Sequence, residues 1–144
     1  MIFLDASAVA KRYFQETGSD RIQELWGRPE LFSSLEILRC ELASILNRKL
    51  RERALSRETY QGLRRQIQDE LMDLGAVPAD RNLIERAIAL LDSHSLKALD
   101  ALYLAGALNL QELANAPVLF VSADRRLLRA ARAEGLKVLD PEAP

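Results

Sequence analysis

The sequence predicts an α/β fold, a three-layer sandwich with a central, mostly parallel β-sheet. Three short apolar runs, at residues 2–4, 118–121 and 137–140, have the length and composition of buried strands. The first two are each followed closely by a helix-like segment, and amphipathic helices account for most of the chain between them. Short buried strands that alternate with helices are typical of a parallel sheet covered by helices on both faces.

In the first half of the chain, residues 2–4 are a strand and the segment from residue 6 a helix. Residues 19–26 are a second helix that ends at Gly27, and residues 31–32 are a possible short strand. Ser33 and Glu36 have the spacing of a capping box, which predicts that a long amphipathic helix opens there. Ser56 begins the next helix, and these two helices form a hairpin with a short basic turn.

In the second half, residues 76–78 are a candidate strand and residues 80–92 a helix, with Leu83, Ala87, Leu90 and Leu91 facing inward. A further helix contains residues 96–108. The strand at residues 118–121, an arginine-rich helix that stops at Gly135 and a last strand complete the chain. Since 144 residues suffice for one buried core and no linker or repeat is visible, we expect a single domain over residues 1–144.

The composition is that of a soluble globular protein, with 49% hydrophobic and 28% charged residues. No basic segment precedes the first apolar run, and no run approaches the roughly 18 apolar residues that a membrane span requires. We therefore expect no signal peptide, no membrane association and a cytoplasmic location. The single Cys40, which allows no internal disulfide, fits a reducing compartment.

The formal net charge of −1 argues against a uniformly basic nucleic-acid-binding surface. Basic residues nevertheless crowd into residues 48–65 and 125–132, and most of them are arginines. Because the planar guanidinium group suits phosphate, these clusters permit an RNA or DNA ligand. Solvated helix faces, balanced by nearby acids, are an equally good interpretation of each cluster alone.

Asp100 interrupts the apolar run LKALDALYLAGAL at residues 96–108. Helical spacing places it on the same face as Leu96, Tyr103, Leu104 and Ala107. A carboxylate removed from water must be paired, protonated or bound to a cation. For this acid alone, a structural ion pair is the simpler interpretation.

Three more acids occupy comparable positions. Asp5 and Asp124 follow strands, where ligands bind in open α/β sheets, although an Asp there is also a favoured helix N-cap. Glu41 lies at the margin of the apolar stripe of its helix. Four carboxylates in one cleft would repel one another unless a cation neutralised them.

Such an all-carboxylate site suits Mg²⁺ or Mn²⁺. His94 is the only histidine and Cys40 the only cysteine, which excludes a zinc site and disfavours Ser/His/Asp or Cys/His catalysis. Ser7 and Ser122 stand beside the acids, as helix caps or as hydroxyls that orient the carboxylates. No glycine-rich phosphate-binding motif is present.

The chain resembles PIN-domain ribonucleases, and most of all the VapC-type toxins of type II toxin–antitoxin systems, in the order and spacing of four segments. These segments are residues 1–14, the helix around Glu41, residues 96–108 and residues 118–140. The resemblance implies a PIN-like nuclease domain, a hydrolase that cleaves RNA endonucleolytically with Mg²⁺ or Mn²⁺. The catalytic metal-binding residues that it implies are Asp5, Glu41, Asp100 and Asp124. Ser122 falls where a supporting Ser or Thr is often found.

The resemblance further implies a homodimer and a small VapB-like antitoxin that covers the pocket. The hairpin of residues 35–74 is the expected place for this antitoxin, and the arginine clusters, with Arg125 and Arg126, are expected to meet the RNA backbone. The main alternative is a catalytically silent PIN-fold module that binds RNA or protein.

Two other classes fit poorly. A haloacid-dehalogenase-like phosphatase needs a second Asp two residues after the first, where this chain has Ser7. A receiver-type signalling module needs a paired acid beside the first strand and a lysine at the end of a late strand, and neither is present.

Overall fold

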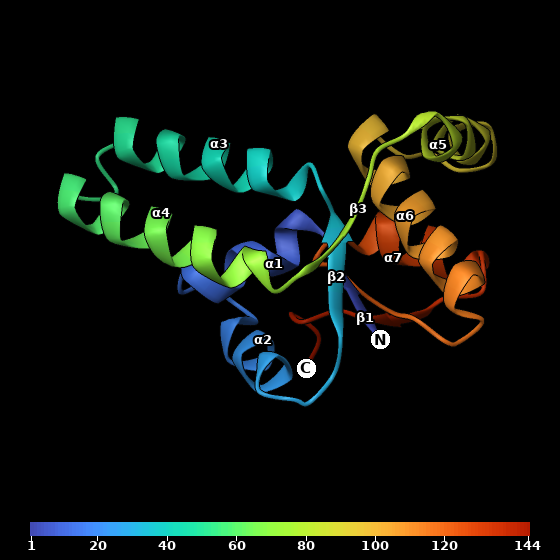
Figure 1. Cartoon of the computed structure of the whole chain (residues 1–144), viewed down its shortest axis with the longest axis horizontal. Helices are drawn as coiled ribbons and strands as arrows, with labels where there is room; N and C mark the ends of the chain where they lie inside the picture. The colour runs from blue at the N-terminus through green and yellow to red at the C-terminus, as the bar shows by residue number, and fades with distance from the viewer.

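The computed structural model describes residues 1–144 as a five-stranded parallel sheet between two layers of helices (Figure 1). The strands are β1 (Ile2–Leu4), β2 (Phe32–Leu35), β3 (Gly75–Val77), β4 (Leu119–Val121) and β5 (Lys137–Leu139). The helices are α1 (Ala6–Tyr13), α2 (Ser19–Trp26), α3 (Leu38–Arg51), α4 (Arg57–Met72), α5 (Arg81–Ser93), α6 (Ala98–Ala114) and α7 (Arg125–Ala133). The predicted α/β sandwich is confirmed.

The strand order is β3-β2-β1-β4-β5, so the first strand of the chain is the central one. Every neighbouring pair is parallel, and Phe3 of β1 lies between Ser33 of β2 and Phe120 of β4. Ile2, Phe3 and Leu4 are fully buried, as expected for a strand covered on both faces. Because all strands run the same way, their carboxyl ends meet at one edge of the sheet.

The two helical layers differ in shape. Helices α5, α6 and α7 lie on one side of the sheet, with α6 packed on β2, α7 on β4 and β5, and α5 against α6 (Figure 1). Helices α1 to α4 lie on the other side, where α3 and α4 form a hairpin that projects away from the sheet (Figure 1). None of the helices is both long enough and apolar enough to cross a lipid bilayer.

Gly106 lets α6 approach the sheet closely. A Cβ atom at this position would lie 2.6 Å from Cδ2 of Leu35 and 3.0 Å from Cζ of Phe3. Both distances are too short for a side chain, so the glycine is required by packing on β1 and β2. This contact fixes the helix that carries Asp100 against the central strands.

The predicted capping box at Ser33 and Glu36 is wrong. Residues 32–35 form β2, and α3 begins only at Leu38, without a side-chain cap. Ser33 and Ser34 are buried in the sheet, and the Ser34 hydroxyl donates a hydrogen bond to the carbonyl oxygen of Leu4 at 2.6 Å. This bond satisfies the buried hydroxyl of Ser34.

The other helix starts are closer to expectation. Helices α4 and α5 begin where predicted, and Ser56 and Asp80 cap them by accepting hydrogen bonds from the backbone N–H groups of Thr59 and Leu83. In α5, however, Leu91 was expected to face inward and is instead 37% exposed. The helix buries a narrower stripe against α6 than its sequence suggests.

Candidate active site

Asp5 and Asp124 lie at the same edge of the sheet because they follow neighbouring parallel strands, β1 and β4. Each also caps a helix. Oδ1 of Asp5 accepts a hydrogen bond from the N–H of Ala8 at 2.9 Å, and Oδ1 of Asp124 accepts bonds from the N–H groups of Arg126 and Leu127. Helix capping is therefore compatible with a role in the site, since capping leaves the second oxygen of Asp124 without a protein partner.

Glu41 and Asp100 reach the same edge from the first turns of α3 and α6. With Asp5 and Asp124 they line one pocket of about 380 Å³. Lys97 is the only basic residue of its lining. The structure thus brings together the four acids that the sequence singled out, from four separate elements on both sides of the sheet.

Two serines hold the Asp5 carboxylate in place. The Ser7 hydroxyl donates to Oδ1 at 2.7 Å and the Ser122 hydroxyl donates to Oδ2 at 2.6 Å. In turn, Ser7 Oγ accepts a bond from the N–H of Ala123, and Ser122 Oγ accepts one from the N–H of Asp124. The serines therefore lock the end of β1 to the end of β4.

Burial and mutual repulsion raise the pKa values of Asp5, Glu41 and Asp100. Burial raises the pKa of Asp5 to about 6, against the opposing hydrogen bonds from Ser122, Ser7 and the N–H of Ala8, and the charge of Asp100 adds to the rise. The pKa of Glu41 is raised by burial and by Asp100. Asp100 therefore contributes to the raised pKa values of both Asp5 and Glu41.

The pKa of Asp100 is raised for the same reasons. Burial raises its pKa first, and the charge of Asp124 raises it further. Lys97 and Arg126 act in the opposite direction. Asp100 is half-buried and forms no ion pair within the chain, so the structural ion pair considered from the sequence is absent.

Tyr103 is a site residue that the sequence reasoning treated only as packing. Its hydroxyl donates a hydrogen bond to Oε1 of Glu41 at 2.5 Å, and the side chain is almost fully buried. It lies three residues after Asp100, on the same helix face. A buried tyrosine hydroxyl needs a polar partner, and this requirement could have pointed to Tyr103 from the sequence. Glu41, an acid at the margin of an apolar stripe with no partner assigned, was the candidate.

The two predicted RNA-binding arginines occupy different places. Arg125 is strongly exposed, and its Nε lies 3.7 Å from Oδ2 of Asp140. Arg126 is close enough to Asp100 to lower the pKa of that acid. Neither lines the acidic pocket.

The donor set suits a hard divalent cation, with one restriction. No three of the His, Cys, Asp and Glu side chains converge closely enough to hold a metal ion together. Mg²⁺ commonly takes only one or two carboxylates and keeps several waters, so convergence of three is not a requirement. The two softer ligands of the chain do not line this pocket: Cys40 is exposed on α3, and His94 contacts Glu134. The acids fit Mg²⁺ or Mn²⁺ held partly through water.

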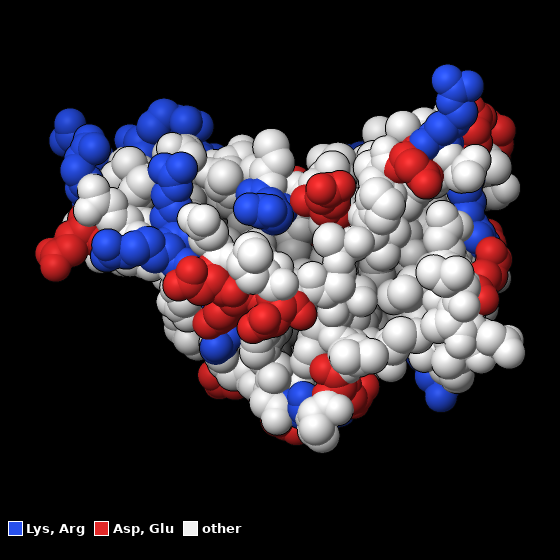
Figure 2. Space-filling view, in the orientation of Figure 1, with Lys and Arg blue, Asp and Glu red and all other residues white.

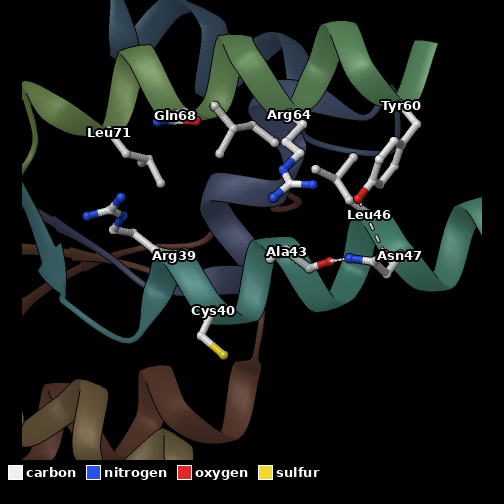
Figure 3. Close-up of a pocket in the computed structure, with 10 residues that line it drawn as sticks. Arg39, Cys40, Ala43, Leu46, Asn47, Tyr60, Arg64, Gln68 and Leu71 are labelled. Carbon is white, nitrogen blue, oxygen red and sulfur yellow. Dashed lines mark hydrogen bonds between the residues drawn. The ribbon is translucent and has the colours of Figure 1, made fainter. Parts of the chain in front are cut away.

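A groove of about 470 Å³ lies between α3 and α4 (Figure 3), and Cys40, which lines it, directly precedes Glu41 of the acidic pocket. Its lining combines aliphatic side chains with arginines, namely Ala43, Leu46, Ile67 and Leu71 with Arg39 and Arg64. Figure 3 shows Arg64 reaching from α4 into the space between the helices. Lysines and arginines also gather at the end of the hairpin away from the sheet (Figure 2).

Comparison with known proteins agrees with this arrangement. The family model described as PIN domain matches residues 2–133. FitAcB from Neisseria gonorrhoeae has a similar structure, with a TM-score of 0.75 and 15% sequence identity over 98% of each chain. VapBC-1 from nontypeable Haemophilus influenzae gives 0.66 and 12% over 99% of this chain and 100% of that chain.

A toxin–antitoxin complex from Klebsiella pneumoniae gives a TM-score of 0.62 and 14% identity over 98% of each chain. No curated protein matches the sequence. At such low identities, the structural likeness establishes a common fold.

Proposed function

Because the chain belongs to the PIN domain family, we propose that it is a Mg²⁺- or Mn²⁺-dependent endoribonuclease and the toxin of a type II toxin–antitoxin pair. Residues 1–144 would form one nuclease domain acting on cytoplasmic RNA. The observation that carries the proposal is the meeting of Asp5, Glu41, Asp100 and Asp124 in one pocket. The structures of similar fold include toxin–antitoxin complexes, which supports the toxin assignment.

In this proposal the four acids hold the cation, directly or through water. When bound, Mg²⁺ or Mn²⁺ supplies a Lewis acid that activates water and neutralises charge on the phosphate. Ser7 and Ser122 keep both oxygens of Asp5 fixed, and Tyr103 orients Glu41. The hydroxyls of Ser7 and Ser122 are engaged in positioning Asp5, so water is the proposed attacking group.

Lys97 has a separate task in the same pocket. It precedes Asp100 by one helical turn and is the only basic side chain among the lining residues. Its ammonium group is placed to attract the phosphate that the surrounding carboxylates repel.

The test uses purified protein, single-stranded RNA and Mg²⁺ or Mn²⁺. We expect cleavage that EDTA abolishes and that Asp100→Asn reduces about 100-fold or more. Asp69→Asn, which removes an exposed carboxylate from α4, is the matched control and should cleave normally. Circular dichroism verifies that both variants are folded.

Absence of cleavage by folded wild-type protein with either metal would favour the alternative, a catalytically silent module that binds RNA or protein. A genetic observation addresses the toxin assignment separately. A small open reading frame beside the gene, whose product suppresses growth inhibition by this chain, is the expected arrangement.

The antitoxin partner would occupy the groove between α3 and α4. The aliphatic part of the lining suits the apolar face of a helix, and Arg39 and Arg64 of the same lining suit acidic side chains beside that face. We therefore propose a partner that presents an amphipathic helix with acidic flanks, inserted in the hairpin and covering the neighbouring acidic pocket.

A second copy of the chain is the proposed partner of α5. Ile84, Ile88 and Leu91 are exposed by 44%, 49% and 37%, and their spacing places them on one helix face. Arg81 and Asp92 flank the same edge of this stripe at its opposite ends, and neither is in an ion pair within the chain. When two α5 helices pair antiparallel about a two-fold axis, each edge of the stripe faces the same edge of the other copy, which runs in the opposite direction. Arg81 would therefore face Asp92 of the second copy.

A further inference from the structure

A second pocket, of about 250 Å³, lies between the α5–α6 connection and α7. Its lining contains no carboxylate and consists of His94, Ser95, Leu96, Arg126, Arg129 and Ala130. We propose that this pocket binds a backbone phosphate of the RNA next to the phosphate that is cleaved. The proposal rests on the proposed function, because it assigns a place to the same RNA.

The two arginines are available for such a ligand. Arg126 and Arg129 are three residues apart on α7, so their side chains lie on one face of the helix. Both are exposed, and neither guanidinium group forms an ion pair in the chain, whereas Arg125 of the same helix contacts Asp140. A pair of free guanidinium groups is well suited to the oxygens of a phosphate.

The opposite wall contributes two further polar groups. Nε2 of His94 lies 2.6 Å from Oε1 of Glu134, which fixes the imidazole ring between the ends of α5 and α7. Nδ1 of His94 and the hydroxyl of Ser95 have no hydrogen-bond partner in the chain. The pocket therefore gathers the free hydroxyl of Ser95 and the guanidinium donors of Arg126 and Arg129, and no carboxylate is among its lining residues.

This pocket adjoins the acidic one. Leu96 lines the second pocket and the next residue, Lys97, lines the first. Arg126 lines the second pocket and lies two residues after Asp124, which lines the first. One RNA strand can therefore place adjacent phosphates in the two pockets.

The acidic pocket needs such a neighbour. Four carboxylates and one lysine repel a polyanion, so affinity for RNA must come from cationic groups beside the acids. Arg126 and Arg129 are such a pair, on the helix that Asp124 caps. They would hold the strand in position while the acids hold the cation.

The test measures binding of a short, fluorescein-labelled single-stranded RNA by fluorescence anisotropy in EDTA, which prevents metal-dependent cleavage. Arg129→Gln should weaken binding about threefold to tenfold, and should reduce the slope of log Kd against log salt by about 0.7, the value for one lost phosphate contact. Arg132→Gln removes the same charge from the same helix outside the pocket, and should change Kd less than Arg129→Gln does.

Kinetics with Mg²⁺ or Mn²⁺ separate this proposal from the nuclease proposal. A pocket that holds a flanking phosphate predicts that Arg129→Gln raises KM and leaves kcat almost unchanged. If wild-type protein cleaves RNA and Arg129→Gln matches Arg132→Gln in Kd and KM, the phosphate pocket is wrong and the nuclease stands. If Arg129→Gln weakens RNA binding but no metal supports cleavage, the nuclease is wrong and the phosphate pocket stands.

Discussion

The hydroxyl of Ser122 donates a hydrogen bond of 2.6 Å to Oδ2 of Asp5, across 117 positions of sequence. This bond ties the end of β4 to the end of β1 and is the strongest of the contacts that keep the pKa of Asp5 from rising further. Ser122→Ala removes it and leaves Oδ2 without a protein donor. We expect the affinity for Mn²⁺ and the rate of RNA cleavage each to fall about 10- to 100-fold.

Ser93→Ala is the matched control for this variant, since Ser93 is an exposed serine that bonds only to a carbonyl oxygen of its own helix. Calorimetric titration with Mn²⁺ gives the affinity and an RNA assay gives the rate. Equal values for Ser122→Ala and Ser93→Ala would contradict a positioning role for Ser122.

The stability of the metal-free protein should depend on pH through Asp5. Its pKa is about 6 in the folded chain and about 3.8 ordinarily, so the folded chain binds this proton more tightly than the unfolded chain does. The contribution of Asp5 is therefore most favourable below the lower value. It is lost as the pH rises toward about 6 and amounts to about 3 kcal/mol at most.

Asp5→Asn isolates this contribution from the other titrating groups. The free energy of unfolding in EDTA, measured by urea denaturation, should favour Asp5→Asn over wild type increasingly from pH 4 to pH 7. A difference that is constant over this interval would show that Asp5 ionises normally in the folded chain.

The positions of the acids were predictable from the sequence to an unusual degree. Asp5 and Asp124 follow recognisable strands, and two parallel neighbours necessarily end at one edge. Asp100 stood out because its helix neighbours are apolar. These are local signals, and the fold brought the acids together as expected.

The parts that could not be predicted depend on tertiary contacts. Ser33 was interpreted as a helix cap, because nothing in the sequence shows that strands on either side would pair with residues 32–35. The Tyr103–Glu41 hydrogen bond joins helices from opposite layers, 62 positions apart. The pocket of Arg126 and Arg129 likewise depends on where the connection at His94 lies, which no local pattern specifies.

The groove between α3 and α4 can be tested by filling it. Ala43 is an exposed residue of α3 that lines the groove, so Ala43→Arg should leave the fold intact while blocking a helix from entering. We expect the antitoxin to bind at least about tenfold more weakly, because a buried apolar contact is replaced by a bulky charge. RNA cleavage by the free variant should remain that of wild type.

Ser44→Arg is the control, as it adds the same side chain to an exposed position of α3 outside the groove. Biolayer interferometry with the product of the neighbouring reading frame provides the measurement. Equal binding by the two variants would place the antitoxin elsewhere.

The exposed apolar stripe of α5, formed by Ile84, Ile88 and Leu91, predicts the oligomeric state. Ile88 lies at the middle of the stripe, where a two-fold pairing brings it against its own copy, so Ile88→Asp would place two carboxylates together in an apolar contact. We expect the wild type to sediment as a dimer and Ile88→Asp as a monomer. Leu113→Asp, which changes a strongly exposed residue at the end of α6, should remain a dimer.

Gly106→Ala should destabilise the protein although alanine favours helices. The added Cβ would lie 2.6 Å from Cδ2 of Leu35 and 3.0 Å from Cζ of Phe3, so these buried side chains or α6 itself must shift. Overpacking of this kind costs about 1–3 kcal/mol, which exceeds the gain of up to about 1 kcal/mol in helix propensity. Because Asp100 is on the same helix, the displacement should also weaken Mn²⁺ binding.

Gly62→Ala provides the opposite case on α4, since no atom lies within 4 Å of a Cβ at that position. There only the helix propensity changes, so the variant should gain up to about 1 kcal/mol and bind Mn²⁺ normally. Urea denaturation measures both variants under the same conditions. If Gly106→Ala were as stable as Gly62→Ala, α6 would not be held against β1 and β2 by close contact at this glycine, and the placement of Asp100 would need another cause.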